Sequence, residues 1–477
     1  MRARIFAEEN RKWLTLGSVS IGLFMIMLDN TVVNVALPSI QRDLGADLSE
    51  LEWIVTGYAL TFASLMLVGG KVADAYGRRL VFIIGIVVFT LASLLCGLAG
   101  SSEMLIGARI LQGAGAALMN PATLSIIAAT FPPRERGTAI GIWAGTSALA
   151  LAIGPLVGGL ITEHINWSWI FFVNVPVGAL GIIASLLFID ESRDETHASL
   201  DLPGLATSAL GLFALTYGLI EANTYGWTSG RIVGAFVLAA VSLGSFLVIE
   251  RRRRDPMLPL ELFRNSTYTG ANLVVLLVAL AMFGVFFFVS LYMQNILGYS
   301  AVQAGAAFLP LTVLIILVAP IAGRASDRIG SRGLMTAGMI LVATQLVLFS
   351  RLSIDSTFWN LLPGMLIGGV GMALTMTPSA AAATRGVPVD KAGVGSAVLN
   401  SARQVGGTMG VAILGAIMAS EIGGEQTPEA FMRGFERALL VAAGIALVGA
   451  VVAYALVRPH EGAGQERRSD AAIEPVA

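Results

Sequence analysis

The sequence predicts an all-α protein that crosses a membrane many times, and three observations lead to this fold class. Hydrophobic residues make up 56% of the chain and charged residues only 13%, whereas soluble domains are about one-quarter charged. So little charge cannot cover a water-facing surface of this size. Apolar runs of about 20 residues recur along the chain, as the hydrocarbon core of a bilayer requires. These runs lack an in/out alternation, which favours helices over a closed barrel.

The apolar runs predict fourteen membrane-spanning helices, each bounded to within a few residues. In chain order the predicted spans are 13–37, 51–70, 80–99, 104–130, 137–161, 168–189, 202–222, 231–249, 268–292, 304–323, 334–352, 358–381, 393–419 and 437–457. Lys and Arg gather in the loops on the side of the N-terminus, among them Arg78, Arg79 and Arg251–Arg254. Because short basic loops stay in the cytoplasm, both termini are expected to be cytoplasmic.

A loop motif occurs twice and indicates two related halves. The segment Gly70–Arg79 follows the second span, and Gly323–Arg332 follows the tenth with Gly, Asp, Gly and a basic residue at the same offsets. Eight spans separate the two copies, whereas two plain six-helix halves would place six between them. The expected organisation is an N-terminal six-helix half (13–190), a linker with two accessory helices (191–266), a C-terminal six-helix half (267–458) and a cytoplasmic tail (459–477).

An acidic residue lies inside the first span. Asp29 belongs to the segment Leu28–Pro38, and an unpaired charge at this depth would cost several kcal/mol, roughly. Such an acid usually faces a cavity and has a function, so Asp29 is the first candidate for a proton carrier. The alternative is an Asp close enough to the outer interface to be simply solvated.

Arg109 is the natural partner of Asp29. It lies in the fourth span, within the segment Arg109–Ala117. At about 1.5 Å per residue, Asp29 is roughly 13 Å and Arg109 roughly 8 Å from the outer ends of their spans, so their depths are comparable. The alternative is that Arg109 caps backbone carbonyl groups near the interface.

Small residues mark the fifth span. Gly154, Pro155, Gly158 and Gly159 lie in one stretch, where glycines permit close helix packing and the proline kinks the helix. Generic small-residue packing is the alternative. Farther along the chain, Arg403 lies roughly 13 Å into the thirteenth span and needs a partner there.

These motifs, together with the segments 167–178 and 400–410, resemble the major facilitator superfamily, and specifically its fourteen-helix drug:proton antiporter branch. The resemblance covers residues 13–458, nearly the whole chain. It implies the major facilitator fold, with Asp29 and Arg109 brought within reach of each other for proton coupling. It also implies a cytoplasmic gate at Gly70, Asp74, Gly77, Arg78, Arg79, Asp327 and Arg328, an antiporter motif at Gly154, Pro155, Gly158 and Gly159, and substrate-cavity candidates at Asn30, Asn34, Gln112, Asn400, Arg403 and Gln404.

The resemblance implies a proton-coupled antiporter that exports lipophilic, drug-like or cationic small molecules across the cytoplasmic membrane. The implied partners are the substrate, protons and membrane lipids. The range 304–323 contains no acid, which puts dicationic substrates in doubt, whereas neutral and monocationic ones remain compatible with Asp29 alone. Glu221 is expected to be solvated at the outer end of the seventh span, and it and Asn223 are expected to tolerate alanine.

Other function classes fit the sequence less well. Basic and acidic residues nearly balance at 30 and 31, so no nucleic-acid partner is indicated. The phosphate-binding signature is absent, so ATP is not expected to drive the protein. The three histidines lie in loops or the tail, so no metal site, cofactor or membrane-embedded enzyme is expected. A proton-coupled nutrient or metabolite symporter of the same fold is the alternative function, and a periplasmic adaptor is left open.

Overall fold

The protein is a bundle of long helices, as seen in a computed structural model that describes residues 8–193, 201–253, 256, 258–385, 387, 392–423, 425 and 427–459. No β-strand occurs among these residues. The helices are α2 (Glu8–Leu44), α3 (Leu48–Tyr76), α4 (Arg78–Gly97), α5 (Ser102–Thr130), α6 (Pro133–His164), α7 (Trp169–Phe172), α8 (Asn174–Phe188), α9 (Leu202–Tyr225), α10 (Gly230–Arg252), η1 (Leu260–Arg264), α11 (Ser266–Leu291), η2 (Tyr292–Ile296), α12 (Ala301–Ala307), α13 (Leu309–Ile329), α14 (Ser331–Phe349), α15 (Phe358–Arg385), α16 (Ala392–Ile422) and α17 (Pro428–Leu456).

The helix lengths are compatible with the fourteen spans predicted. Within the described part of the chain, twelve helices are long and apolar enough to cross a membrane, and α3, which is bent by 51°, makes thirteen. Helix α6, which is 32 residues long, is a further long helix beside these thirteen. In two of the spans a short helix precedes a longer one, α7 before α8 and α12 before α13.

Several helices extend beyond the predicted ranges, and the largest difference is at the start of the last helix. Helix α17 begins at Pro428 rather than at 437, because the Thr427 side chain accepts from the backbone N–H of Ala430 and proline occupies the first turn. Arg433, which precedes the predicted span 437–457, therefore lies on the helix.

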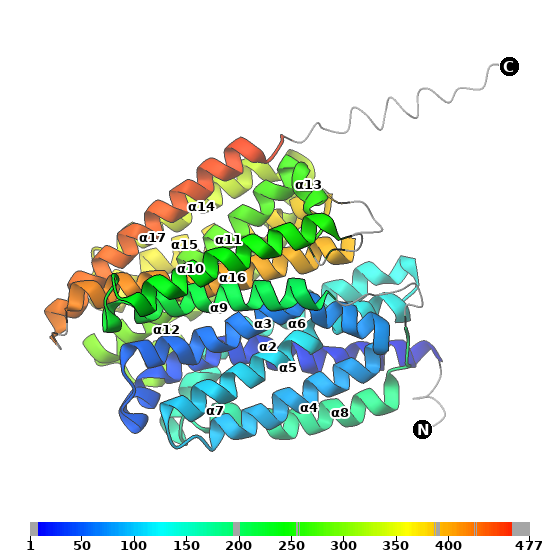
Figure 1. Ribbon diagram of the computed structural model, residues 1–477, viewed down its shortest axis with the longest axis horizontal. Helices are drawn as coiled ribbons and strands as arrows, with labels where there is room; N and C mark the ends of the chain where they lie inside the picture. The colour runs from blue at the N-terminus through cyan, green and yellow to red at the C-terminus, as the bar shows by residue number, and fades with distance from the viewer. Residues whose placement is uncertain are drawn as a thin grey trace.

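The helices form two groups with an additional pair beside them (Figure 1). Helices α2 to α8 pack on one another, and so do α11 to α17. Helix α9 packs on α3 of the first group and on α16 of the second, while α10 packs on α9. The inserted pair is thus attached through α9 at the line where the two groups meet.

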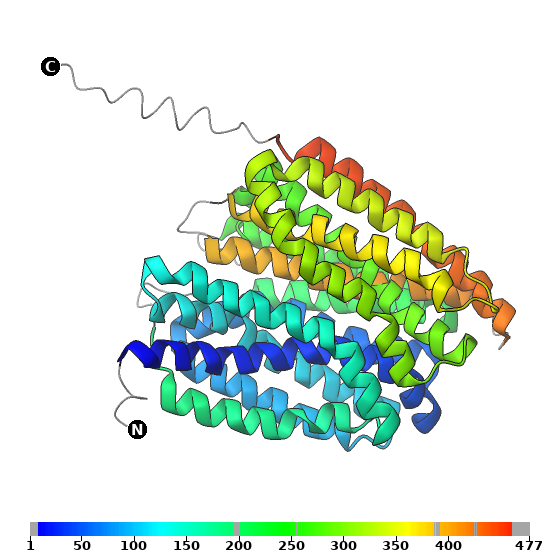
Figure 2. The ribbon, with the colours of Figure 1, turned by 180° about the vertical axis from the view of Figure 1, so that it is seen from behind.

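The two groups touch at one end of the bundle. Helix α2 begins and α17 ends at the other end, which we call the terminal face (Figures 1 and 2). At the far face, the Ser290 hydroxyl donates to the Asn34 carbonyl over 2.8 Å and the Gln294 amide donates to the Val35 carbonyl over 2.9 Å. The backbone N–H of Val302 donates to Glu163 over 2.8 Å. These bonds join α2 and α6 to α11, η2 and α12.

Glycines set the distance between the helices within each group. A Cβ atom at Gly406 or Gly410 of α16 would lie 2.2 or 2.1 Å from a backbone oxygen of α11. Only the absence of a side chain permits this approach, and in lipid such close van der Waals packing holds helices together. The positions of the polar side chains described below depend on this tight framework.

Candidate functional site

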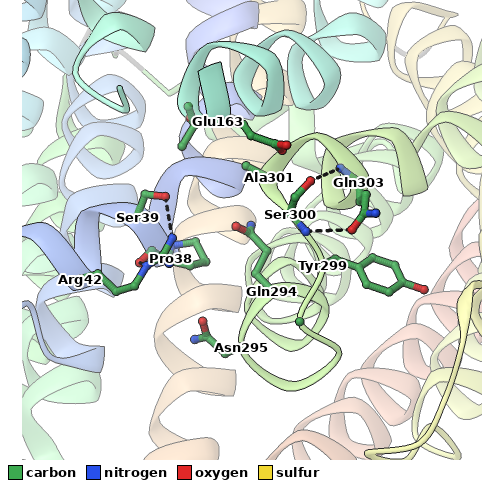
Figure 3. Close-up of a pocket in the computed structure, with 12 residues that line it drawn as sticks. Pro38, Ser39, Arg42, Glu163, Gln294, Asn295, Tyr299, Ser300, Ala301 and Gln303 are labelled. Carbon is green, nitrogen blue, oxygen red and sulfur yellow. Dashed lines mark hydrogen bonds between the residues drawn. The ribbon is translucent and has the colours of Figure 1, made fainter. Parts of the chain in front are cut away.

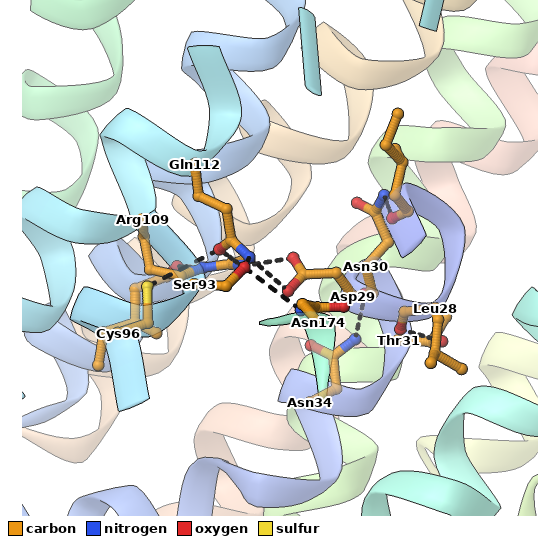
Figure 4. A network of polar contacts seen from close by, with 12 residues as sticks. Leu28, Asp29, Asn30, Thr31, Asn34, Ser93, Cys96, Arg109, Gln112 and Asn174 are labelled. Atoms are coloured by element: carbon orange, nitrogen blue, oxygen red, sulfur yellow. Dashed lines mark hydrogen bonds and ion pairs between the residues drawn. The ribbon is translucent and has the colours of Figure 1, made fainter. Parts of the chain in front are cut away.

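Asp29 and Arg109 form an ion pair inside the first helix group (Figure 4). The Arg109 Nη1 atom lies 2.5 Å from Asp29 Oδ2, and Arg109 Nε donates to the Ile54 carbonyl over 3.1 Å. Gln112, one turn along α5, donates from its amide nitrogen to Asp29 Oδ1 over 2.9 Å and to Ser93 over 2.8 Å. Its amide oxygen accepts from Arg109 over 2.6 Å. The network joins α2, α3, α4 and α5.

The ion pair is removed from water. The side chains of Arg109 and Asp29 are 2% and 0% exposed, and the guanidinium lies 4.2 Å from the centre of the Tyr58 ring, a cation–π contact. A buried ion pair is tolerated when further hydrogen bonds satisfy both partners, whereas removing one partner leaves an uncompensated charge at a cost of about 3–5 kcal/mol. A proton that neutralised Asp29 would therefore weaken its bonds to Arg109 and to Gln112.

Close helix packing brings the pair together. A Cβ atom at Gly113 would lie 2.4 Å from the Tyr58 carbonyl of α3, and one at Gly115 would lie 2.6 Å from the Phe89 backbone nitrogen of α4. Helix α5 is thus held against both neighbours on the faces beside Arg109 and Gln112.

The glycines of the fifth-span motif lie where α6 meets its neighbours. A Cβ atom at Gly154 would lie 1.8 Å from Thr31 Oγ1, and one at Gly158 would lie 2.8 Å from the Val32 carbonyl. These two residues seat α6 on α2. A Cβ atom at Gly159 would lie 2.4 Å from the Ala301 carbonyl of α12. Likewise, a Cβ atom at Gly305 of α12 would lie 2.2 Å from the Pro155 carbonyl. The motif thus reaches both helix groups.

The first loop motif binds to the end of its own helix group. Asp74 and Arg78 form an ion pair of 2.8 Å, and Gly70 lies against Pro121. Gly77 has φ +120°, a conformation that favours glycine. The Glu191 carboxylate accepts from the backbone N–H groups of Arg79 and Leu80 at the start of α4.

The second loop motif lies in a matching place in the other group. Asp327 lies 3.7 Å from Arg385 of α15, and its side chain is 75% exposed. Arg385 also donates to Ser326 and Ser331, while Arg328 is exposed at the terminal face. Both loops thus lie on the terminal face, where no bond between the two groups is found among the described residues.

The predicted cavity residues do not form one cluster. Gln112 is 0% exposed and belongs to the ion-pair network. Asn30 and Asn34 donate to carbonyl groups one turn earlier in α2. Asn400 is half-buried on α16 and has an interaction partner.

Helix α16 carries three polar atoms without partners. These are Ser401 Oγ, Arg403 Nε and Gln404 Nε2. Arg403 forms no ion pair within the part of the chain that the structure describes. The partner that its depth in the span calls for is therefore not an Asp or Glu among these residues. A substrate or water could satisfy these donors.

A hollow of about 640 Å³ opens at the far face between the groups (Figure 3). Its polar lining includes Arg42 and Glu163 from the first group and Gln294, Asn295 and Gln303 from the second. It marks the outer edge of the contact between the groups, and none of the predicted site residues lines it.

Two acids near the far face were not predicted as site residues. Glu52 of α3 is 2% exposed. Glu221 of α9 is half-buried and accepts from Ser49 over 3.0 Å and from Trp53 over 3.1 Å, so the expectation of a simply solvated side chain is wrong. The sequence contains one indication of a role for Glu52, because this acid lies inside the predicted span 51–70.

Comparison with known proteins identifies relatives of the chain. The sequence profile described as Major Facilitator Superfamily matches residues 19–411. The puromycin resistance protein pur8 of Streptomyces alboniger is 38% identical over 98% of this chain and 95% of its own. The tetracenomycin C resistance and export protein of Streptomyces glaucescens is 37% identical over 87% of this chain and 77% of its own.

Solved structures share the fold. A bacterial homolog of the human lysosomal transporter Spinster, in an inward-facing and unoccupied conformation, has a TM-score of 0.66 at 16% identity, covering 94% of this chain and 97% of that chain. A peptide transporter named POT, in complex with sulfate, has a TM-score of 0.67 at 16% identity, covering 92% and 94%.

Proposed function

Because the chain belongs to the major facilitator superfamily, we propose that it is a proton-coupled antiporter that exports lipophilic, drug-like or cationic small molecules across the bacterial cytoplasmic membrane. Relatives named for antibiotic resistance and export support the direction of transport and the class of substrate. The basic loops 70–79 and 323–332 support a cytoplasmic terminal face. The far face is then the outer side.

The buried Asp29–Arg109 pair is the observation that carries the proton-coupling part of this proposal. A proton on Asp29 Oδ2 removes the charge that holds Arg109, and Oδ1, which accepts from Gln112, becomes a weaker, neutral acceptor. Helices α2 and α5 are then tied less strongly at this point. Proton binding and helix movement are coupled by this exchange, as alternating access requires.

We place the substrate between the helix groups, with α16 as one wall. The unpaired donors of Arg403 and Gln404 support this placement because a buried donor without an acceptor is costly until a ligand supplies one. The closed far face supports a state open toward the cytoplasm, from which a drug-like molecule would enter.

The test uses ethidium as the exported probe in everted vesicles that contain the full-length protein. An imposed proton gradient should drive ethidium uptake, and an uncoupler should abolish it. Asp29→Asn should lose the driven uptake, at least tenfold, while the exposed control Glu103→Gln keeps it. Undiminished driven uptake by Asp29→Asn would show that Asp29 does not couple transport to protons.

A further inference from the structure

Glu52 is an acid inside the bundle that belongs to neither the Asp29 network nor the loop motifs. It is 2% exposed, and its Oε2 atom has no hydrogen-bond partner. No basic residue in the described ranges forms an ion pair with it. An ionised carboxylate buried without a partner is far less favourable than the neutral acid. The observed position therefore suits a carboxyl group that carries a proton.

The carboxyl group of Glu52 lies in the contact between the two helix groups. A Cβ atom on Gly415 of α16 would lie 2.0 Å from Glu52 Oε1, so the acid fills space that only a glycine leaves. Glu52 is about 6 Å from the start of α3, and Gly415 about 10 Å from the end of α16. The contact thus lies near the far face, where water arrives when the groups separate.

The surroundings of Glu52 supply further negative charge and no free cation. The acids whose charges act on it are Glu221 of α9 and Asp47, which caps α3. The other charged or titratable groups near the far-face ends of these elements each have a contact: Glu50 with Ser102, Tyr217 with Arg231, Arg231 with Tyr225, and Glu421 with Arg437. Arg403 of α16 lies about 18 Å farther along that helix than Gly415. Ionisation of Glu52 would therefore add repulsion to the cost of burial.

We propose that Glu52 is a proton-binding site that controls the outer gate, meaning the contact of α3 with α16. With the proton bound, the neutral carboxyl group packs against Gly415 and the gate closes. When the proton leaves, the carboxylate needs water and the two helices separate. The assignment of the far face to the outside rests on the proposed function.

The proton on Glu52 comes from and returns to the outer water. An O–H bond forms on the carboxylate when the open gate takes up a proton, and the same bond breaks when the gate reopens. Glu52 thus adds nothing to the number of protons that cross the membrane, which differs from the role proposed for Asp29. It makes the return to the inward-open state depend on an acidic exterior.

The experiment measures the gate directly in lipid nanodiscs without substrate. Spin labels on Glu103→Cys and Ser420→Cys, both exposed positions, in a Cys96→Ala background report the distance across the far face. As the pH rises from about 5 to about 9, the gate of the parent protein should open. Because one proton is released, the ratio of open to closed gate should change by at most about tenfold per pH unit. Glu52→Gln, which is neutral and of equal size, should keep the gate closed at high pH.

Glu50→Gln is the matched control, two residues before Glu52 on the same helix and part of the capping box of that helix. It should titrate as the parent protein does. An unchanged pH response in Glu52→Gln, or a parent gate that ignores pH, would overturn the proposal. So would a lower ratio of protons to ethidium in Glu52→Gln, because Glu52 would then carry a transported proton.

A second pair of variants keeps the test decisive if Glu52→Gln does not fold. Gly415→Ala should push the gate open, because its Cβ overlaps the carboxyl group, and the double variant Glu52→Ala/Gly415→Ala should close it again. A closed gate in Gly415→Ala would contradict the packing argument. The distance measurement needs no transport, so absence of ethidium export would refute the proposed function and leave this result standing.

Discussion

Asp29 and Arg109 each require the other, because both are buried at a depth where a single charge would be unstable. Gln112 connects them through both ends of one amide group, which accepts from the cation and donates to the anion. The sequence predicts the pair through two family motifs. It does not predict that the Gln112 amide bridges the two charges. That bridge depends on which side of α5 faces α4, and this is set by packing at Gly115.

Replacing Gln112 should destabilise the protein without removing either charge. In Gln112→Leu, one oxygen of Asp29 and the hydroxyl of Ser93 lose their donor, at a cost of about 1–3 kcal/mol. Thermal unfolding in detergent, followed by tryptophan fluorescence, should show a lower midpoint. Ser93→Ala keeps Asp29 paired and should cost less. Equal midpoints for Gln112→Leu and the parent protein would argue against a supporting role for the amide.

Helix α6 is the element that joins the groups on one side of the far face, as α3 and α9 do on the other. Its glycines are not equivalent: Gly141 and Gly145 have open space where a Cβ would lie, whereas Gly154, Gly158 and Gly159 do not. The sequence predicts a small-residue helix but not which glycines make contact, because that requires the neighbouring helices.

Gly159→Ala should hold the far face partly open. The added methyl group would lie 2.4 Å from the Ala301 carbonyl, a backbone atom that cannot rotate away. We expect ethidium transport to fall about tenfold or more, with a longer distance across the far face between spin labels. Gly145→Ala, on the same helix, should transport normally. A Gly159→Ala protein with normal transport and distance would exclude this contact as part of the gate.

Helix α9 is attached to both groups by side chains near its end. Glu221 accepts from two residues of α3, and the Asn223 amide donates to the Ala416 carbonyl of α16 over 2.7 Å. From the sequence, Glu221 and Asn223 were expected to tolerate alanine. Because both residues bond to neighbouring helices, we now expect alanine at Asn223 to reduce transport. The inserted pair remains outside the Asp29 network.

Asn223→Ala should loosen α9 from the second group while leaving proton coupling intact. Ethidium transport should fall severalfold, and the ratio of protons to ethidium should stay constant. Thr207→Ala, whose hydroxyl donates only within α9, is the control. If thiol labelling of cysteines along 205–220 were blocked by ethidium, α9 would line the transport path and this accessory role would be wrong.

On the scale of the whole molecule, the bonds between the groups lie at the far face and the two loop motifs lie apart from each other at the terminal face. Asp74 and Asp327 pair within their own groups in this state. We expect them to latch the terminal face when the molecule opens the other way. Predicting the fourteen segments needed only hydropathy. The sequence places Glu52 inside a predicted span but does not show what it packs against, because that depends on Gly415 far along the chain.

Asp74→Asn should slow turnover with little change in substrate binding. The neutral amide cannot pair with Arg78 or with a basic residue of the other group, so the state with a closed terminal face should become less populated. Ethidium binding by fluorescence and spin-label distances across the terminal face provide the measurement. Lost binding with unaltered distances would disprove the latch.

The length of α2 has a consequence for how the molecule responds to salt. Its 37 residues extend about 55 Å, well beyond a hydrocarbon core of about 30 Å. Near its start, Arg11 pairs with Asp190 and Lys12 with Glu135, at side chains 20% to 72% exposed. The Debye length falls from about 10 Å at 0.1 M to about 3 Å at 1 M, so concentrated salt weakens such exposed contact pairs, whereas ions do not reach the buried Asp29. High ionic strength should therefore free the aqueous end of this helix and leave its centre anchored.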